Sequence, residues 1–250
     1  FDVALSSQSP SEVVFYVDDA NMSAHGLLGN NSTAPVAAGA GYTLDAPGVA
    51  VDLARGYGAE HLCVRNSSDD VYCWGRSDVG QVGAGVGDAL TPRFVLGGAT
   101  SLCAGETHTC AVAGGDAFCW GHDADGQLGV VGTLDQPAPE PVVALPEPVD
   151  VVACGARHTC AYQAVPGGKL WCWGFNTTGA LGVGDVAWHE LPVLVPLTDL
   201  VDLSAGIYHT CAVTSAGLVY CWGAADYGQV GNGTTTLDYP SAEQVVGIGG

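Results

Sequence analysis

Basic residues are scarce in this chain. Its 250 residues contain one lysine, Lys169, and five arginines against 26 acidic residues, which gives a formal net charge of −20. Contacts with nucleic acid or acidic lipid need clustered Lys and Arg side chains that displace counterions. We therefore expect no nucleic-acid partner and no attraction to an acidic membrane surface.

Long apolar runs are absent as well. No stretch approaches the roughly 18 uninterrupted apolar residues of a transmembrane helix, so membrane insertion is not expected. The chain starts at Phe1 without a signal-like apolar segment, which indicates either a removed targeting segment or a piece of a longer chain.

Enzyme motifs are also missing. There is no Gly-x-Ser-x-Gly nucleophile elbow, and the Gly-x-x-Gly turns that do occur precede proline-rich segments. A phosphate loop would instead lead into a helix N-terminus with a lysine. We expect no enzyme activity, no catalytic residue and no cofactor.

What the chain has instead is a repeat. The tripeptide Cys-Trp-Gly occurs four times, its tryptophans being Trp74, Trp120, Trp173 and Trp222. The copies lie 46, 53 and 49 residues apart, and a period of roughly 20–50 residues with strands inside it is typical of propellers and solenoids. A Gly-x-x-Gly turn follows each copy, and a fifth such turn at Gly26 to Gly29 marks a fifth unit.

Alignment of the copies divides a single domain, 1–250, into five units: 1–48, 49–97, 98–147, 148–198 and 199–250. The first unit is degenerate, since Val3-Ala4-Leu5 and Val14-Phe15-Tyr16 stand where the others carry cysteines. The chain begins inside what would be the second strand of a unit, and Gly250 stops just before the first strand of the next. We expect the array to be part of a larger ring or of a longer chain.

The cysteines fall into facing pairs. In the unit 98–147, two β-rich segments flank Gly114-Gly115, a two-residue link typical of tight hairpins. This register places Cys110 opposite Cys119, at the cross-strand separation of about 4.5–5.5 Å that suits a disulfide. The other units carry the pairs Cys63 and Cys73, Cys160 and Cys172, and Cys211 and Cys221.

Two cysteines, Cys103 and Cys154, remain at nearly equivalent places in adjacent units, one residue out of register. They either join the two units or stay as free thiols, and we favour the bridge. Paired cysteines indicate an oxidising compartment such as a secretory lumen, the periplasm or the extracellular space. The alternative is a set of buried free thiols, because cysteine also occurs in cores as a small apolar residue.

A segment rich in Pro and Val follows the Gly-x-x-Gly turns, at 92–95, 141–144 and 192–195. Proline cannot donate to a strand ladder, so we interpret this segment as the outermost strand. No helical apolar period occurs, and the pattern predicts an all-β fold, a β-propeller of four-stranded antiparallel blades. The repeated tryptophans are expected to wedge between neighbouring blades.

These motifs carry a family resemblance. The runs His-Thr-Cys-Ala-Val at 209–213, Tyr-Cys-Trp-Gly at 220–223 and Gly-Gln-Val-Gly-Asn-Gly-Thr at 228–234 resemble the regulator of chromosome condensation repeat, over nearly the whole chain. The resemblance implies a propeller, commonly a seven-bladed ring of which this array would be a part, with roles from nucleotide exchange on a small GTPase to secreted inhibition of β-lactamases. The matching residues build blades, so no functional residue is carried over. Charge and cysteine content favour a secreted, Cys-rich variant and oppose the chromatin role of the namesake.

Every asparagine begins an Asn-x-Ser/Thr sequon: Asn21, Asn30, Asn31, Asn66, Asn176 and Asn232. This pattern predicts N-glycans on exposed loops of a secreted eukaryotic protein. The alternative is turn-forming asparagine in a bacterial propeller, since several of these residues share one repeat position.

Two further patterns resemble metal ligands. One histidine per unit lies two residues before a cysteine, at His61, His108, His158 and His209. The repetition indicates a structural hydrogen-bonding role, because a metal site needs different groups that converge. The segment Asp123 to Gly126 resembles the start of a calcium loop but lacks the later Glu, so we interpret it as a solvated turn. We expect no metal site.

Two classes of function fit the sequence. The first is a non-enzymatic extracellular structural or protein-interaction module, with other proteins as partners and self-assembly into a surface assembly or filament as one form. The second is a secreted inhibitor or ligand-binding propeller, glycan binding included. The second predicts that Tyr57, Tyr208 and Tyr227 cluster on one face as interface anchors.

Overall fold

The protein is built from β-strands and turns. The structure is a computed structural model and describes residues 4–9, 12–16, 41–43, 49–235 and 238–247. These residues contain no helix, and so none that is long and apolar enough to cross a membrane.

Four sheets of four antiparallel strands follow one another along the chain. The first blade contains β4 (Ala50–Ala54), β5 (His61–Asn66), β6 (Val71–Gly75) and β7 (Ala89–Leu96). The second contains β8 (Ala99–Ala104), β9 (His108–Ala113), β10 (Asp116–Gly121) and β11 (Gln136–Pro141). The third contains β12 (Val151–Cys154), β13 (His158–Tyr162), β14 (Lys169–Gly174) and β15 (His189–Thr198). The fourth contains β16 (Leu200–Ala205), β17 (His209–Thr214), β18 (Val219–Gly223) and β19 (Tyr239–Gln244).

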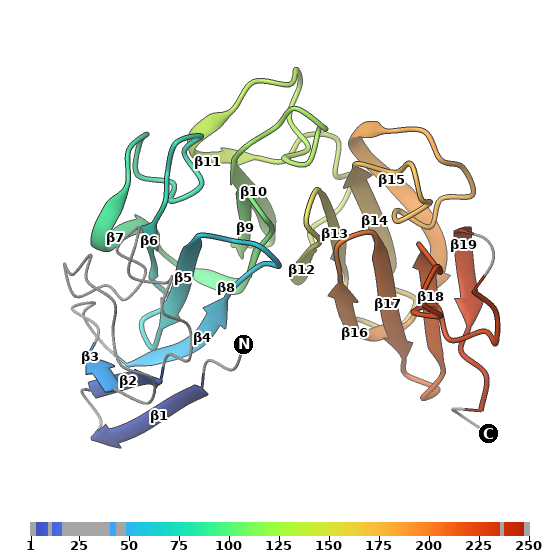
Figure 1. Cartoon of the computed structure of the whole chain (residues 1–250), viewed down its shortest axis with the longest axis horizontal. Helices are drawn as coiled ribbons and strands as arrows, with labels where there is room; N and C mark the ends of the chain where they lie inside the picture. The colour runs from blue at the N-terminus through green and yellow to red at the C-terminus, as the bar shows by residue number, and fades with distance from the viewer. Residues whose placement is uncertain (1–3, 10–11, 17–40, 44–48, 236–237, 248–250) are drawn as a thin grey trace.

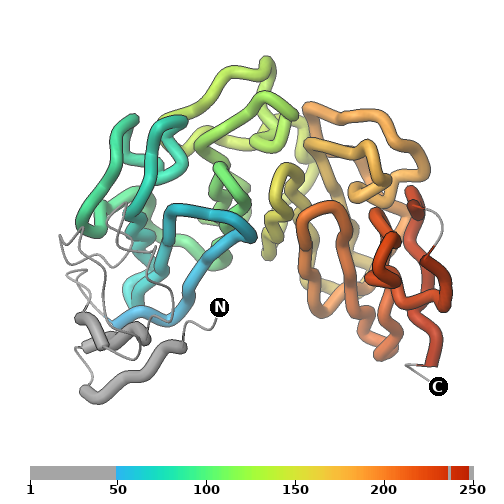
Figure 2. Tube along the Cα trace, in the orientation of Figure 1, coloured from blue at the N-terminus to red at the C-terminus, as the bar shows by residue number. Residues whose placement is uncertain are grey.

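The predicted β-propeller of four-stranded antiparallel blades is confirmed. In each blade the strands pair in sequence order, and the blades follow one another along an arc (Figures 1 and 2). In the degenerate first unit the described residues form three paired strands, β1 (Ala4–Ser9), β2 (Glu12–Tyr16) and β3 (Gly41–Thr43). Complete four-stranded blades are thus described for the other four of the five expected units.

The first strand of each blade is the innermost. Parts of β4, β8, β12 and β16 line one central cavity of about 270 Å³, and the fourth strands lie at the outer edge (Figure 1). The expected outer position of the Pro-rich segment is confirmed, with one correction. In the second blade the strand is β11, Gln136–Pro141, and not 141–144. Its three prolines lack the N–H that an inner strand would need.

All ten cysteines are paired. Four bridges join facing residues of the second and third strands, with Cα atoms 4.1 Å apart in every case: Cys63–Cys73, Cys110–Cys119, Cys160–Cys172 and Cys211–Cys221. The register expected from Gly114-Gly115 is confirmed, since Cys119 lies opposite Cys110. The fifth bridge, Cys103–Cys154, joins β8 of the second blade to β12 of the third.

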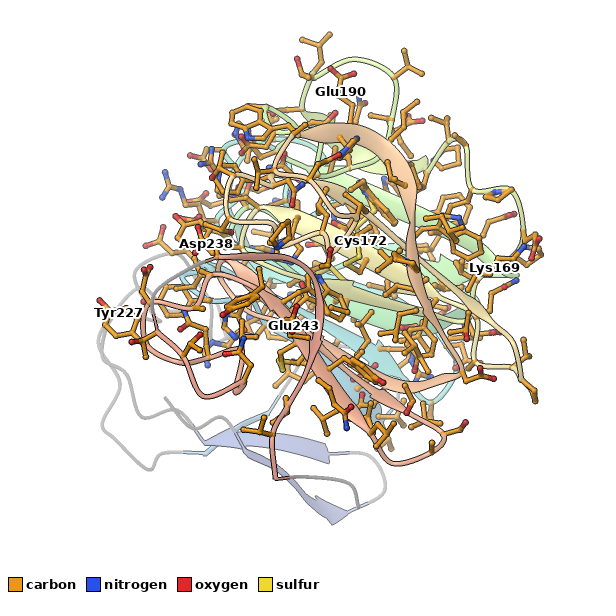
Figure 3. The ribbon with its side chains drawn as sticks, turned by 90° about the vertical axis from the view of Figure 1, so that its right-hand side faces the viewer. Lys169, Cys172, Glu190, Tyr227, Asp238 and Glu243 are labelled. Carbon is orange, nitrogen blue, oxygen red and sulfur yellow. A yellow bond between two sulfur atoms is a disulfide. The ribbon has the colours of Figure 1, made fainter. Side chains whose placement is uncertain are left out.

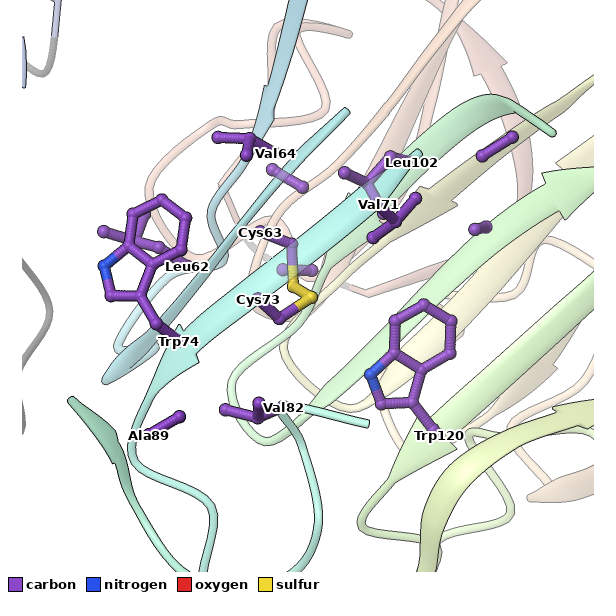
Figure 4. Close-up of a cluster of buried hydrophobic side chains, with 14 residues drawn as sticks. Leu62, Cys63, Val64, Val71, Cys73, Trp74, Val82, Ala89, Leu102 and Trp120 are labelled. Atoms are coloured by element: carbon purple, nitrogen blue, oxygen red, sulfur yellow. A yellow bond between two sulfur atoms is a disulfide. The ribbon is translucent and has the colours of Figure 1, made fainter. Parts of the chain in front are cut away.

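The repeated tryptophans pack between blades. Trp120 is fully buried and its Nε1–H donates to the backbone oxygen of Gln81, in the turn of the preceding blade, at 3.1 Å. Trp173 and Trp222 make the same bond to Gln127 and Ala180. Figure 4 shows Trp120 in the cluster that also holds Val82 and the Cys63–Cys73 bridge. The expected wedge between blades is confirmed.

The repeated histidines hold the same junctions. Thr109 Oγ1 donates to the Gln81 oxygen at 3.0 Å, so it accepts a hydrogen from His61 Nε2 at 2.8 Å. The relay repeats from His108 to Thr159 and from His158 to Thr210. Burial lowers the pKa of His61 to about 4. These rings are neutral and structural, which agrees with the interpretation of one hydrogen-bonding histidine per unit.

Candidate protein-interaction surface

Loops gather at two ends of the blades. In an antiparallel meander, the loop between strands one and two and the loop between strands three and four leave from the same end. We call this end the turn face, because it carries the Gly-x-x-Gly turns. Figure 3 shows Tyr227 of the β18–β19 loop on one side and Lys169, at the start of β14, on the other. Tyr57, Tyr208 and Tyr227 all lie on loops of the turn face.

A cavity of about 450 Å³ opens on the turn face. It is bounded by loops of all four blades, and its lining includes Arg76, Asp78, Glu106, His122, Arg157 and Tyr208. Its two arginines are already paired. Arg76 contacts Glu60 at 2.6 Å and Asp78 at 2.7 Å, and Arg157 contacts Asp125 at 2.6 Å. Hydrogen bonds to both carboxylates raise the pKa of Arg76. The cavity is therefore polar but does not offer an unpaired cation to an anionic ligand.

An aromatic cluster lies beside this cavity. The Phe175 ring contacts Trp188 at a centroid distance of 5.5 Å and Tyr208 at 5.7 Å. The Arg157 guanidinium lies 5.3 Å from the Phe175 centroid, within cation–π range. Trp188 is 52% exposed and Tyr208 40% exposed. We call Arg157, Phe175, Trp188 and Tyr208 the aromatic patch.

The patch spans two blades and is held in place. Phe175 and Trp188 lie on the β14–β15 loop of the third blade, and Tyr208 lies on the β16–β17 loop of the fourth. The backbone oxygen of Tyr208 accepts hydrogen bonds from Thr178 Oγ1 at 3.0 Å and from the Ala224 N–H at 2.8 Å. The backbone that carries Tyr208 is therefore fixed by hydrogen bonds across the two blades, and a backbone fixed before binding lowers the entropic cost of binding.

Sequence reasoning identified only Tyr208 of this patch. Tyr57, Tyr208 and Tyr227 share the turn face, as the second class of function predicted, but each lies on a different loop. Sequence reasoning missed Arg157 of the β12–β13 loop and Phe175 and Trp188 of the β14–β15 loop. One signal was available, because Trp188 is a tryptophan placed beyond the Cys-Trp-Gly strand, in the loop that leads to the outer strand.

The interpretation of Asp123 to Gly126 as a solvated turn is wrong. Asp123 is 0% exposed and Asp125 3% exposed. Asp123 Oδ1 accepts a hydrogen from the Leu128 N–H at 2.9 Å, and Asp125 pairs with Arg157. Burial raises the pKa of Asp123 to about 7. These carboxylates brace the turn beneath the aromatic patch rather than face water.

The expected glycans on exposed loops do not fit two of the sequons. Asn66 is 3% exposed and Asn176 0% exposed. Asn176 Nδ2, the atom that would carry a sugar, donates to the Asp185 backbone at 3.0 Å. Asn232 is partly exposed, and its Oδ1 accepts from Thr234 Oγ1. Asn21, Asn30 and Asn31 lie outside the described residues.

Disulfide-bridged, four-stranded blades around a shared centre define a β-propeller protein. Sequence models of the regulator of chromosome condensation (RCC1) repeat match residues 114–162 and 167–213, and a second model of this repeat matches residues 56–81 and 200–229. The chain belongs to the RCC1 repeat family.

Relatives in this family are much longer than the chain. The ultraviolet-B receptor UVR8 of Arabidopsis thaliana is 36% identical over 198 residues, which cover 75% of this chain and 44% of the receptor. The human E3 ubiquitin-protein ligase HERC2 is 32% identical over 187 residues, which cover 71% of this chain and 4% of the ligase. The chain thus spans less than half the length of these relatives.

Solved propellers have the same fold. Yeast RCC1 (Prp20), in its complex with Kap60, matches with a TM-score of 0.75 and 21% identity, covering 94% of this chain and 57% of Prp20. Human WBSCR16 matches with a TM-score of 0.75 and 21% identity, covering 94% of this chain and 65% of that protein. At this identity the likeness concerns the fold alone.

Proposed function

We propose that this chain is a non-enzymatic protein-interaction module that acts outside the reducing cytosol, and that the aromatic patch is its binding centre. The observation that carries the proposal is the ordered group of Trp188, Tyr208 and Arg157 at an exposed junction of two blades. Tryptophan, tyrosine and arginine dominate the residues whose truncation weakens protein complexes most.

Two further observations support the proposal. Structural disulfides form and persist mainly in oxidising compartments, so the five bridges favour the secretory pathway or the extracellular space. Asn232, which begins a sequon, is partly exposed and so is accessible to N-glycosylation in the secretory pathway. Related propellers are known with protein partners: yeast Prp20 was solved bound to Kap60, and was described with binding properties to Gsp1p and histones.

The charge of the chain indicates which kind of protein surface its partner presents. A net charge of −20 attracts a basic protein surface and repels an acidic one. We expect the partner to place a basic rim around an apolar centre that receives Trp188. Self-assembly of identical acidic chains has to overcome their mutual repulsion, so a heterologous partner is the stronger form of this proposal.

The test uses the purified chain, oligomerised on a carrier and applied to an array of secreted proteins and ectodomains. Trp188→Ala together with Tyr208→Ala should weaken capture of the partner on the order of 30-fold or more. Phe94→Ala is the matched control, since Phe94 is 56% exposed but lies on the outer strand β7. Capture that survives the double substitution, or that Phe94→Ala removes equally, would contradict the role of the patch.

A second candidate is a secreted inhibitor or ligand-binding propeller, glycan binding included. One observation favours it: Tyr57, Tyr208 and Tyr227 occupy a common face, and Tyr57 and Tyr227 are 70% and 93% exposed. Silence on a glycan array with and without calcium would remove the glycan form. The same double substitution would leave glycan binding through Tyr57 or Tyr227 intact, which separates the two candidates.

A further inference from the structure

One disulfide differs from the other four in place, and it alone has two partly exposed cysteines, because among the hairpin bridges only Cys211 is partly exposed. Cys103–Cys154 joins the innermost strands of two blades, whereas the others each lie within one hairpin. Both of its residues are partly exposed and line the central cavity of about 270 Å³. By contrast, Cys110 and Cys119 of the neighbouring hairpin are fully buried. A small reagent in the cavity therefore meets the Cys103–Cys154 bridge and not the hairpin bridge.

Three sulfur atoms from two disulfides meet at this junction. Cys103 on β8 is the cross-strand partner of Cys110 on β9, and Cys110 lies opposite Cys119 on β10. The Sγ atoms of Cys103, Cys110 and Cys154 all lie within 4.8 Å of one another. Cys110 thus has two disulfide partners within reach, its own and Cys103. The equivalent positions to Cys103 in the other complete blades hold Ala54, Ala153 and Ser204.

We propose that Cys103–Cys154 is a thiol–disulfide exchange site. A dithiol that enters the central cavity reduces this bridge, and the Cys103 thiolate then attacks the Cys110–Cys119 bridge. The reactive form of a thiol is its thiolate, which attacks one sulfur of a disulfide and releases the other. The proposal needs only the proximity of these sulfurs and the access of Cys103 and Cys154 to the cavity.

The exchange proceeds in three steps that conserve sulfur–sulfur bonds, electrons and protons. One thiolate of the dithiol bonds to Sγ of Cys154, and Cys103 leaves as a thiolate. The second thiolate of the dithiol then displaces Cys154, so that the dithiol departs oxidised and its two protons remain with Cys103 and Cys154. The Cys103 thiolate next bonds to Sγ of Cys110, the Cys110–Cys119 bond breaks, and Cys119 receives the proton that Cys103 gave up.

The product has a different connectivity. A Cys103–Cys110 bridge now ties β8 to β9 within the second blade, Cys119 and Cys154 are thiols, and the covalent tie between the blades is lost. The junction keeps its other contacts, since Trp173 Nε1 and Thr159 Oγ1 still donate to the Gln127 oxygen. We therefore expect the blades to stay folded while the central junction loosens.

Dithiothreitol titration of the native protein tests the first step. Samples are quenched with acid, labelled with N-ethylmaleimide and mapped by peptide mass spectrometry. Cys154 should be labelled first, together with Cys103 or Cys119, at a rate on the order of tenfold or more above Cys63–Cys73 and Cys160–Cys172, because buried bridges react only after local opening. Loss of all five bridges together with unfolding, or loss of a hairpin bridge first, would overturn the proposal.

The variant Cys154→Ser tests the second step, because it leaves Cys103 without its partner. A non-reducing digest should contain the Cys103–Cys110 peptide and labelled Cys119. In the digest of the matched control, Cys103→Ser with Cys154→Ser, Cys110 should be found only in the Cys110–Cys119 peptide, and Cys119 should be unlabelled. If Cys103 stays the sole labelled cysteine in folded Cys154→Ser protein, the relay does not occur. If that variant does not fold, appearance or absence of the Cys103–Cys110 peptide in the wild-type titration decides the same point.

Discussion

At the scale of single residues, one position of the repeat shows how burial changes the chemistry of a side chain. In the four complete blades, the residue three before the Gly-x-x-Gly turn is Ser77, Asp123, Asn176 or Ala225. Ser77, Asp123 and Asn176 each accept a hydrogen from the backbone N–H five residues later. Asn176 Nδ2 also donates to Asp185, whereas Asp123 Oδ2 is buried and has no hydrogen-bond partner among the described residues. An ionised carboxylate is therefore the least suitable group at this position.

We predict that Asp123→Asn stabilises the protein at alkaline pH and has little effect in acid. Burial raises the pKa of Asp123 to about 7, above the ordinary value of 3.8. Its contribution to stability is complete below pH 3.8 and is lost as the pH rises through about 7. Asn cannot ionise, so the gain at pH 8 should be on the order of 4 kcal/mol and should nearly vanish near pH 4. Urea unfolding at both pH values measures it, and a gain that is independent of pH would contradict the assignment.

At the scale of the element, each blade packs against the tryptophan of the next at one glycine. The last glycine of a Gly-x-x-Gly turn lies under the tryptophan of the following blade, and a Cβ on Gly129 would come within 2.8 Å of Trp173 Nε1. The same approach occurs between Gly83 and Trp120 and between Gly182 and Trp222. The two motifs recur together because they form the two sides of one inter-blade contact.

We predict that Gly129→Ala destabilises the protein by about 3 kcal/mol, from left-handed backbone strain and overpacking together. Gly98→Ala is the matched control: Gly98 has φ +73° against +70° for Gly129, but its Cβ would meet nothing within 4 Å. The control should lose only the strain cost of about 1 kcal/mol. Denaturant unfolding compares the two, and equal losses would show that the contact with Trp173 does not matter.

At the scale of the whole molecule, a row of neutral histidines runs through the blade junctions. Burial lowers the pKa of His61 and His158 to about 4 and that of His108 to about 3, from an ordinary value of 6.5. Between pH 6.5 and pH 4 these histidines bind protons in the unfolded chain but not in the folded chain. Their contribution to the free energy of unfolding is therefore complete above pH 6.5 and is lost as the pH falls toward 4. The raised pKa of Asp123 acts in the opposite direction, but three histidines outweigh it.

We predict that the urea midpoint falls steadily between pH 7 and pH 4.5. In His108→Gln the side-chain amide can still donate to Thr159 but does not titrate, so the loss across this range should shrink by about a third. Proton resonances of the three rings should show no titration above pH 5. Rings that titrate near pH 6.5 would refute the buried relay.

Sequence proved most informative where the contacts are local. The Gly114-Gly115 turn fixes which residues of two adjacent strands face each other, so the hairpin bridges follow from a few residues of chain. The burial of side chains and the contacts between loops far apart in the sequence could not be predicted from such local patterns. The sequons at Asn66 and Asn176 and the acidic turn at Asp123 were expected to be exposed, because a short motif carries no information on what packs over it.

The sequence by itself determined the repeat, the all-β blade and the pairing of cysteines across each hairpin, since period, alternation and turn chemistry act within one unit. Only the tertiary structure decided which units touch through Trp and Gly, that Cys103 meets Cys154 and Cys110, and that Arg157, Phe175, Trp188 and Tyr208 form one patch. The physical reason is that these contacts join residues on different blades or loops, and their distances are set by how whole blades pack around the centre.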